Sequence, residues 1–565
     1  MASTFSGLEL SRRALASQQV ALNITGHNIA NANTQGYTRQ IANLTATTPD
    51  TISSAGRNLS LGSGVTLDTI TRARDAFVDR QFRSETSKQQ YWASKEDSLG
   101  KVEDILNEPT DDSLSNDMNK FWTAWSDLSK DPENAGARSV VSERAQVLTD
   151  SFHNIAQQVS DMKENMDVSI KVQITQINTY AKQIKDLNDQ IKQAEVSGDN
   201  PNDLRDKRDS LVDDLSKIVS VKVVETKDPK FEDRDVNNFK VIIGNDDSDS
   251  NTLVNDSAVR LLEDPPPQET INGFNSSRVV WSNDLADNNV DLGTKLGTLA
   301  ADIEVRNEDL YNFGLQIDTL AQGIADGVNA LHQSGQGLTA ENQVDPVTGG
   351  PIGINFFTDD STSEDTSEDT SEDTGEDGSI IRSSTPPGLP RVTAASITLN
   401  SEIVKDVKRI ATGAIPLDTN DPLSHATNAD DPTTLLVTVG DGTVAQGISS
   451  LSSGWKALVS QIAAGKFGTI DGVVQDPVAA TSFVDLYAAN VAQLGVDVQQ
   501  VTRMKAGEDV LVTNVANQRE SIAGVSLDEE MTNLIKYQKS YSAAARIVTM
   551  MDDMLSTLMN IGITK

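Results

Sequence analysis

The last forty residues of the chain carry a hydrophobic repeat that requires a long helix with an equally long partner. Apolar or aromatic side chains recur at every seventh position from residue 527 to residue 555, and a second series follows three positions after the last four of them. The two series are Leu527, Leu534, Tyr541, Val548 and Leu555, and then Tyr537, Ala544, Met551 and Leu558. A coiled coil buries such positions against another helix. The pattern predicts a helix of ~50 Å, and no neighbouring stretch supplies its partner.

A matching repeat lies at the opposite end of the chain. Leu8, Leu15, Leu22 and Ile29 are also spaced by seven residues, and the alanines at positions 14, 16 and 21 keep this helix slim. Two terminal helices with matching seams predict a coiled coil between the chain ends, and an exposed seam of this kind suits assembly with other subunits. The alternative is a pair of amphipathic helices packed on an ordinary globular core.

Composition narrows the possible functions. The aromatic content of 4% favours elongated helical packing over one large core, and 565 residues suffice for several domains. The formal net charge of −36 argues against a nucleic-acid partner, because phosphate contacts require Lys and Arg. The absence of cysteine excludes disulfides and thiol nucleophiles. No stretch approaches eighteen apolar residues and no cleavable signal is recognisable, so we expect neither membrane insertion nor signal cleavage.

Between the terminal helices, an extended segment is followed by helical patterns on both sides of the middle of the chain. Residues 41–75 predict an extended hairpin, residues 75–106 a helix, and residues 137–196 a long helix with isoleucine at every seventh position from 170 to 191. A return helix follows Pro201, and residues 479–517 supply another helical face. We expect a rod-like bundle whose sequence ends meet and whose middle points away. Phe121, Trp122 and Trp125 are expected to be buried in it.

The middle of the chain has a different pattern. Strand-like stretches at 219–224, 239–243, 392–399 and 434–439 surround a helical interlude at 298–331. Residues 359–378 hold ten acidic and no basic residues, which predicts a solvated loop. The overall prediction is a mainly α chain with paired terminal helices, a helical bundle and an inserted β-rich outer domain. The expected domains are residues 1–40 with 525–565, residues 41–220 with 445–524, and residues 221–444.

Motifs for chemistry are incomplete. Ser453 and Lys456 match the Ser-x-x-Lys spacing of acyl-transfer enzymes, but the companion motifs are missing. The four histidines, at positions 27, 153, 332 and 425, are isolated, and none lies in a His-Glu-x-x-His zinc motif. We therefore predict no catalytic residue, no cofactor and no metal.

The residues that follow the first helix carry a family resemblance. The run His-Asn-Ile-Ala-Asn-Ala-Asn-Thr-Gln-Gly-Tyr-Thr-Arg-Gln at 27–40 resembles the N-terminal signature of bacterial flagellar rod, hook and hook-associated proteins. Its signature positions are Asn28, Asn31, Asn33, Thr34, Gly36, Tyr37, Arg39 and Gln40. Residues 524–561 resemble the C-terminal signature of the same group. The form Thr38-Arg39-Gln40 and the segment Asn-Asp-Leu-Arg-Asp-Lys-Arg-Asp-Ser-Leu at 202–211 are similar to the hook-associated members.

This resemblance implies a structural, non-enzymatic component of the flagellum, an adaptor at the hook–filament junction that assembles through its terminal helices. The implied partners are hook protein, a second hook–filament junction protein, further copies of this chain in a ring, and an export chaperone at the C-terminal helix. The implied location is the flagellum outside the cell, reached by type III export without a cleaved signal. Two alternatives stay open: a hook or rod subunit, or a surface-exposed binding or enzymatic protein that uses flagellar-type ends for export.

Overall fold

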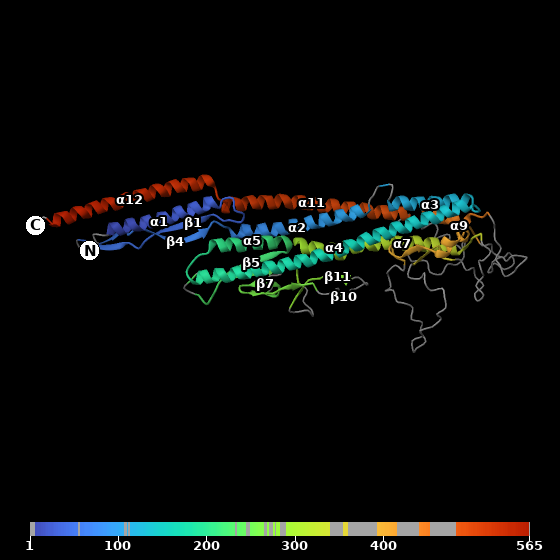
Figure 1. Cartoon of the computed structure of the whole chain (residues 1–565), viewed down its shortest axis with the longest axis horizontal. Coiled ribbons are helices and arrows are strands. Elements are labelled where there is room, and N and C mark those ends of the chain that lie inside the picture. Colours follow the sequence, from blue (N-terminus) through green and yellow to red (C-terminus); the bar gives the residue numbers. More distant parts are fainter. Residues whose placement is uncertain are drawn as a thin grey trace, which may run out of the picture.

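The protein is an elongated rod with both termini at the same end (Figure 1). The computed structural model describes residues 6–54, 57–106, 110, 113–231, 234, 236–244, 249–264, 268–269, 275–276, 278–282, 290–338, 354–359, 392–414, 440–452 and 482–563. Its principal elements are helices, which confirms the prediction of a mainly α chain. The predicted strand at 434–439 and, apart from Asp359, the acidic run at 359–378 lie outside the described residues.

The terminal end of the rod consists of two helices and a long hairpin. Helix α1 (Ser6–Ala30) packs along helix α12 (Leu527–Ile563). Gly7 packs against the end of the Met551 side chain, so α1 and α12 approach closely at this point. The hairpin pairs β1 (Gln40–Ala46) with β4 (Val65–Arg72), and β2 (Asp50–Ser54) pairs with β3 (Arg57–Leu61).

The body of the rod is a bundle of sequence-distant helices. Helix α2 (Ala76–Leu106) runs beside α11 (Phe483–Ala523), and α4 (Ala135–Val196) runs beside α5 (Asn202–Ile218). The 62 residues of α4 correspond to ~90 Å at 1.5 Å per residue. Its heptad isoleucines are buried, with Ile170, Ile177 and Ile184 at 0% exposure. The repeat thus marks the face that α5 and the neighbouring sheet cover.

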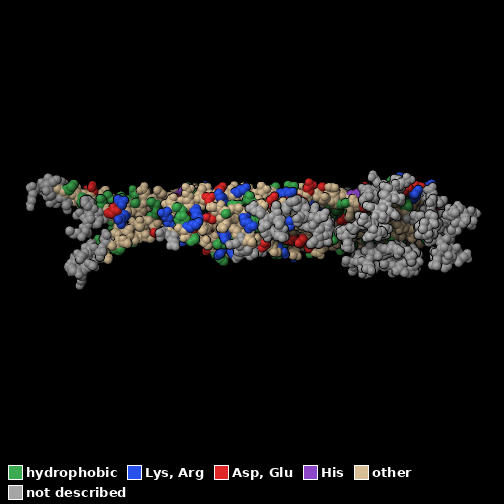
Figure 2. Space-filling view, turned by 90° about the horizontal axis from the view of Figure 1, so that it is seen from below, with side chains coloured by type: hydrophobic (Ala, Val, Ile, Leu, Met, Phe, Trp, Pro, Cys, Tyr) green, Lys and Arg blue, Asp and Glu red, His purple; other side chains and the backbone are tan. Residues whose placement is uncertain are grey.

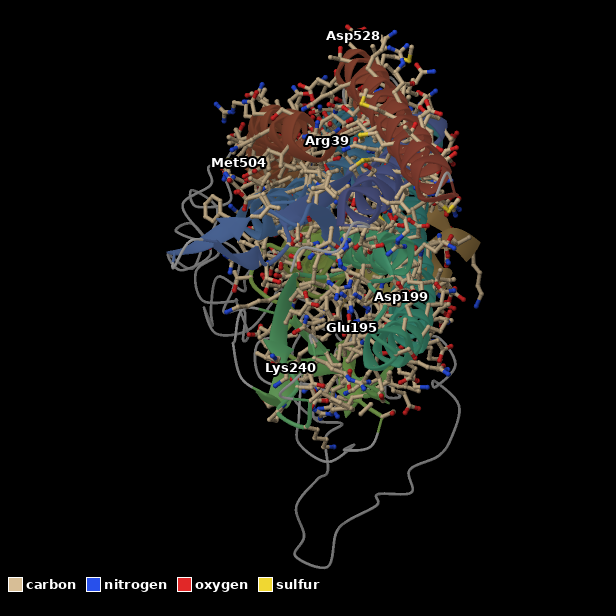
Figure 3. The ribbon with its side chains drawn as sticks, turned by 90° about the vertical axis from the view of Figure 1, so that its left-hand side faces the viewer. Arg39, Glu195, Asp199, Lys240, Met504 and Asp528 are labelled. Atoms are coloured by element: carbon tan, nitrogen blue, oxygen red, sulfur yellow. The ribbon has the colours of Figure 1, made fainter. Side chains whose placement is uncertain are left out.

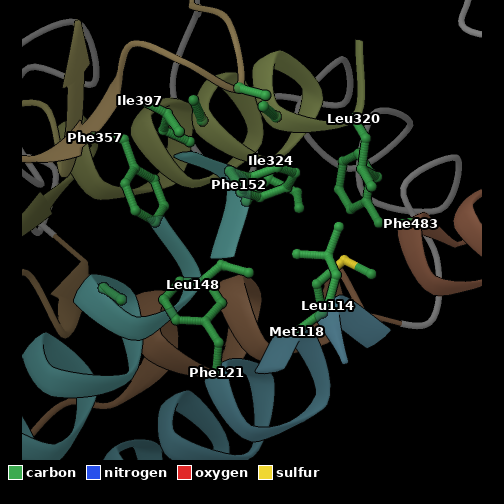
Figure 4. Packing of buried hydrophobic residues seen from close by; sticks show 14 of the residues in the cluster. Leu114, Met118, Phe121, Leu148, Phe152, Leu320, Ile324, Phe357, Ile397 and Phe483 are labelled. Carbon is green, nitrogen blue, oxygen red and sulfur yellow. The ribbon is translucent and has the colours of Figure 1, made fainter. Parts of the chain in front are cut away.

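The far end of the rod holds a second core. Helix α3 (Leu114–Lys130) begins at the N-cap Ser113 and packs against α4, α9 (Thr443–Ser450) and the first turns of α11. Phe121 and Trp125 have no exposed area, and the Trp122 ring stacks on Phe483 at 6.3 Å. The close-up in Figure 4 shows these helices contributing apolar side chains to one cluster. The expectation that the three aromatic residues are buried is confirmed.

The middle of the chain divides between the body and a small sheet. Helix α6 (Gly297–Glu304), a π-helical segment (Val305–Asp309) and α7 (Leu310–Gln333) pack against α2, α4 and α11. The sequence grouped this segment with the outer domain, but the structure places α7 in the body because its apolar face lies in the far-end core. The strands β5 (Val221–Lys227), β6 (Asn237–Ile243), β7 (Thr252–Asn255) and β8 (Ala258–Val259) form an antiparallel sheet.

Short elements complete the middle region. Three antiparallel pairs join sequence-distant strands: β9 with β12 (Leu262–Glu263, Val280–Trp281), β13 with β16 (Gly335–Gln336, Gly413–Ala414) and β14 with β15 (Phe357–Asp359, Ile397–Leu399). The pair β10 with β11 (Gln268–Glu269, Asn275–Ser276) and the helix α8 (Ser401–Lys405) complete the set.

Two buried polar side chains attach this region to the body. The guanidinium of Arg138 on α4 donates to the carbonyls of Pro132 and Ile410 and to the Thr412 hydroxyl. His332 on α7 is fully buried, and its Nε2 accepts the backbone N–H of Ala411 at 2.9 Å.

The inner face of α4 should control the stability of the body. Leu148 is fully buried and Leu148→Ala leaves a cavity, so we expect the free energy of unfolding to fall by about 2–5 kcal/mol. Val172 lies on the same helix and is 59% exposed, and Val172→Ala should change the free energy of unfolding by less than about 0.5 kcal/mol. Urea denaturation followed by circular dichroism measures both. Equal losses would show that the faces of α4 are wrongly assigned.

Candidate functional site at the base of the terminal helices

The turn that follows α1 is organised by the side chain of Asn28. Its Oδ1 accepts the Tyr37 hydroxyl at 2.7 Å and the backbone N–H of Gln40 at 3.0 Å, while its Nδ2 donates to the Gln40 carbonyl at 2.9 Å. Asn28 is only 1% exposed. One amide therefore fixes the end of α1 against the first residue of β1. We call residues 27–40 the signature turn.

The remaining signature residues shape this turn. Asn31 donates to the His27 carbonyl, and the Thr34 hydroxyl donates to the Asn31 Oδ1 at 3.2 Å. Gly36 has a φ of 78°, a left-handed conformation that a side chain disfavours. The side chain of Asn33 is exposed. Burial, followed by the negative charge of nearby carboxylates, raises the pKa of Tyr37 far above its ordinary value, so the phenol remains a hydrogen-bond donor.

The signature turn contacts the body and α12 as well as α1. The buried backbone N–H of Thr38 donates to the Asp206 carboxylate at 3.0 Å, and the Gln40 side chain donates to Asp203 at 2.8 Å. The Arg39 backbone N–H donates to the Ala523 carbonyl at the end of α11, and its guanidinium pairs with Glu529 of α12 at 2.6 Å. Figure 3 shows Arg39 near the place where the α11 and α12 ribbons meet.

Beneath the turn lies a network of buried ion pairs. Arg72, the last residue of β4, contacts Asp206 at 2.8 Å and Asp209 at 2.7 Å. Arg74 contacts the same Asp209 carboxylate at 2.7 Å and Asp79 of α2 at 2.5 Å. The hairpin, α2 and α5 therefore share charged partners. We call the signature turn together with this network the joint.

The network extends to the C-terminal half of the chain. Arg519 of α11 contacts Asp213 of α5 at 2.6 Å and Asp79 of α2 at 3.0 Å, while Arg83 of α2 contacts the other oxygen of Asp213 at 2.6 Å. Segments more than 300 residues apart in sequence thus meet within one set of charges. A buried ion pair contributes little net stability, but the loss of one partner leaves a buried charge unpaired. The network therefore specifies one arrangement of the hairpin, α2, α5 and α11.

Asp209 lies at the centre of these charges. Burial alone would raise the pKa of its carboxyl group, but the surrounding guanidinium groups, with Arg74 and Arg72 foremost, hold the pKa well below its usual range. The carboxyl group is therefore ionised in the folded chain at any pH near neutrality.

A cleft of about 620 Å³ with both polar and apolar lining opens beside the joint. It is lined by the signature turn, by residues 183–190 of α4 and by residues 203–211 of α5, and we call it the joint cleft. Within the described part of the chain, no group of three or more His, Cys, Asp or Glu side chains is placed to hold a metal ion. The cleft presents amide, hydroxyl and carboxylate groups, which suits binding of another polar surface.

The terminal seam is only partly covered in the single chain. Leu8, Leu15, Leu22 and Ile29 on α1 are half-buried, as are Leu534, Tyr537, Val548, Met551 and Leu555 on α12. Leu527 and Tyr541 are 51% and 37% exposed, and the side chain of Leu558 lies outside the described residues. The buried positions include small or polar ones, among them Ala21, Ala544 and Ser11. The role of the seam in assembly stays a prediction.

Sequence reasoning recognised the signature turn and the 202–211 segment, but it did not connect them. It also missed Arg72, Arg74, Arg83 and Arg519 as their partners. The signal available was two arginines directly after a strand pattern, together with four aspartates on one short helix, at 203, 206, 209 and 213. Neither feature specifies which charges meet, because the pairs span more than a hundred residues.

Comparisons with known proteins agree on one group. The model described as "Flagellar hook-associated protein FlgK helical domain" matches residues 99–352. The models "Flagellar basal body rod FlgEFG protein C-terminal" and "Flagella basal body rod protein" match residues 516–561 and 8–38. Flagellar hook-associated protein 1 of Bacillus subtilis is 28% identical over 99% of both chains. Its Escherichia coli counterpart is 26% identical over 97% of this chain and 98% of that one.

One solved structure shares the fold. It is the flagellar hook junction protein FlgK from Burkholderia pseudomallei, with a TM-score of 0.54 and 16% identity. The similarity covers 79% of this chain and all of that one. None of the described helices is both long enough and apolar enough to cross a membrane.

Asp209 should carry a large share of the acid sensitivity of the folded chain. Its pKa is lower folded than unfolded, so its ionised form stabilises the fold above about pH 4, and this stability is lost as the pH falls further. Asp209→Asn should therefore lower the free energy of unfolding at pH 7 by about 3–5 kcal/mol and flatten its decline below pH 4. Urea titrations between pH 2 and pH 7 measure both effects.

The matched control for this prediction is Asp214→Asn on the same helix. The side chain of Asp214 is 41% exposed and pairs with Lys217 one turn away, so its loss should change stability by less than about 1 kcal/mol. If the two variants behave alike, the buried network does not hold the joint together.

Proposed function

We propose that this chain is a member of the flagellar hook-associated protein 1 family and the adaptor that joins hook to filament through its terminal helices. Members of this family are structural components of the flagellum at the hook–filament junction. The observation that carries the proposal is the terminal end of the rod, where α1 and α12 pack together and leave apolar side chains uncovered. Curated relatives span nearly the whole chain, which supports the same function for all of its parts.

The uncovered face of α12 supports an assembly role. Met531, Ile535, Met550 and Met554 each have half or more of their side chain exposed. Soluble chains rarely expose contiguous apolar surface on this scale without a partner. We therefore assign the terminal helices, residues 1–40 with 525–565, to the inner part of the assembled tube. Residues 41–220 with 445–524 form the next shell, together with α6 and α7, and the rest of 221–444 lies outermost.

The proposed partners follow from this arrangement. Hook protein lies below, the second junction protein lies above, and copies of this chain form a ring between them. Before assembly, an export chaperone covers the C-terminal helix, whose apolar side chains would otherwise promote aggregation. The chain reaches the flagellum by type III export without signal cleavage and has no catalytic activity. We infer both properties from the likeness to this family.

The match to the FlgK helical domain distinguishes this function from its nearest rival. A hook or rod subunit shares the terminal signatures, and the rod-type models at both ends agree equally well with it. The junction-protein model over residues 99–352 favours the adaptor, because it covers the long helix and the joint segment. A surface protein that uses flagellar-type ends only for export would not be expected to match the helical-domain model over residues 99–352.

Two aspartates on the inner face of α12 should abolish assembly without unfolding the body. Leu534 and Leu555 are half-buried and lie three heptads apart. Burial of a leucine contributes about 1.5–3 kcal/mol, and an unpaired carboxylate in its place costs more. The variant Leu534→Asp with Leu555→Asp should therefore fail to bind isolated hook ends in a pull-down, while the melting curve of the body stays close to that of the unmodified chain.

The matched control changes two charged side chains that do not face α1. Lys536 and Lys539 are exposed on α12, so Lys536→Gln with Lys539→Gln alters the charge of the same helix without placing a carboxylate in the seam or on its exposed apolar face. This variant should still bind hook ends. Binding by the leucine variant would refute the role of the seam, and collapse of its melting curve would show that the terminal helices belong to the globular fold.

A further inference from the structure

The first turn of α2 carries an exposed aromatic side chain beside a free cation. Phe77 is 64% exposed and is the one phenylalanine among the exposed large hydrophobic side chains of the described residues. Arg80 lies one helical turn further on, is exposed, and makes no ion pair or hydrogen bond with any residue that the structure describes. Aromatic residues and arginine dominate the binding energy of protein interfaces. We call this pair the α2 knob.

The α2 knob points away from the helices that hold α2 in place. Arg83 of α2 pairs with Asp213 of α5, and Phe82 lies under the guanidinium of Arg519 on α11. At 100° per residue, Phe77 is turned by ~120–140° from both of these side chains, while Arg80 lies ~60° from Arg83 on the side away from Phe82. The knob therefore projects from the surface of the rod close to the joint, since Arg74 of the buried network lies only three residues before Phe77.

The joint cleft has the complementary chemistry. Leu187 and Leu211 supply apolar lining, while the side chains of Asp186 and Asp203 are 66% and 60% exposed. Lys207 is the one lysine among the lining residues. A volume of about 620 Å³ lies in the range of clefts that accept a large side chain. The cleft thus offers space for an aromatic ring and a carboxylate for an arginine.

Knob and cleft lie at the same level of the rod on different sides. The cleft lies on the α4 side of α5, whereas the knob projects from α2, whose contacts with α5 run through Asp209 and Asp213. The end view in Figure 3 shows α4 and α5 on one side of the rod, with the β1–β4 hairpin on the other. A chain cannot fill its own cleft in this arrangement. A neighbouring copy turned about an axis parallel to the rod can, and repetition of that step gives a ring where the rotation closes.

We propose that Phe77 and Arg80 of one copy enter the joint cleft of the next copy in the ring, with the guanidinium against the carboxylate of Asp186. This inference rests on the proposed function, because it takes the ring of copies as its setting. It assigns the lateral contact to the base of the terminal helices, outside the coiled-coil seam. On the face in Figure 2, basic and acidic side chains are interspersed along the body, so a second interface of one sign is not evident there.

The absence of cysteine from the sequence allows a direct test. In a chain with Arg80→Cys and Asp186→Cys, the two thiols come near each other only between successive copies. The contact spans the length of an arginine side chain, which is longer than a disulfide allows, so a short bismaleimide crosslinker should give a ladder of crosslinked oligomers on a denaturing gel. Each single variant should stay monomeric, because a head-to-tail contact never brings two equal positions together. The crosslinking is carried out on concentrated free chain and on chain bound to hook ends.

A ladder under either condition supports the contact. A ladder from free chain without binding to hook ends would uphold the contact and refute the junction function. Binding to hook ends without a ladder would refute the contact and leave the junction function intact. No ladder and no binding would refute both. Dimers from the Arg80→Cys chain alone would overturn the head-to-tail arrangement.

A charge exchange tests the same contact without cysteines. Arg80→Glu should raise the chain concentration needed for half-maximal assembly on hook ends by about tenfold, as expected for loss of an interface arginine. Arg80→Glu combined with Asp186→Arg should restore assembly in part, because every copy then carries the exchanged pair. Lys101→Glu, on the same helix but paired with Asp97, is the control and should have little effect. Failure of the exchange to restore assembly, with an unchanged melting curve, would refute the pairing.

Discussion

The buried arginine–aspartate network is the interaction on which the architecture depends. Four aspartates on α5 and α2, at 79, 206, 209 and 213, meet arginines from β4, α2 and α11 in a space that excludes most water. Such a network adds little net stability, because desolvation offsets the attraction, but it penalises every arrangement that leaves one charge unpaired. It therefore fixes how the hairpin and the helices of the body meet. The contacts of Thr38 with Asp206 and of Arg39 with Glu529 then set the direction of the terminal helices relative to this network.

The joint also explains how a chain with nested topology becomes one rod. Its ends pair as α1 and α12, its next segments pair as α2 and α11, and the far-end core unites α3, α7 and α9. Each layer buries apolar surface of its own, with Phe121 and Trp125 in the far core and the isoleucines of α4 in the middle. The layers follow one another along the rod because α1 leads through the hairpin into α2, and α11 leads into α12. Among the described helices, α12 exposes the most large apolar side chains, which is consistent with partners that complete it.

For the proposed adaptor, the structure separates two kinds of surface. The terminal helices offer adaptable apolar contacts, four of them through exposed methionines at 531, 550, 554 and 559, whose flexible side chains fit more than one partner. The α2 knob and the joint cleft offer a contact of defined shape and charge. An adaptor between two different structures requires both properties, because its ends must accept dissimilar neighbours while its ring keeps one geometry.

The sequence by itself determined the helices and the family. Heptad leucines and isoleucines, capping residues and the glycine of the signature turn act over a few residues, so the bounds of α2, α4 and α12 could be predicted closely. The sequence did not determine which face of α1 is most deeply buried, where small and polar residues such as Ser11, Ala21 and Asn28 allow close approach. Nor did it place α7 in the body or join Arg72 to Asp209. Those features depend on contacts between segments more than a hundred residues apart, and a local pattern carries no information about which distant charge or groove completes it.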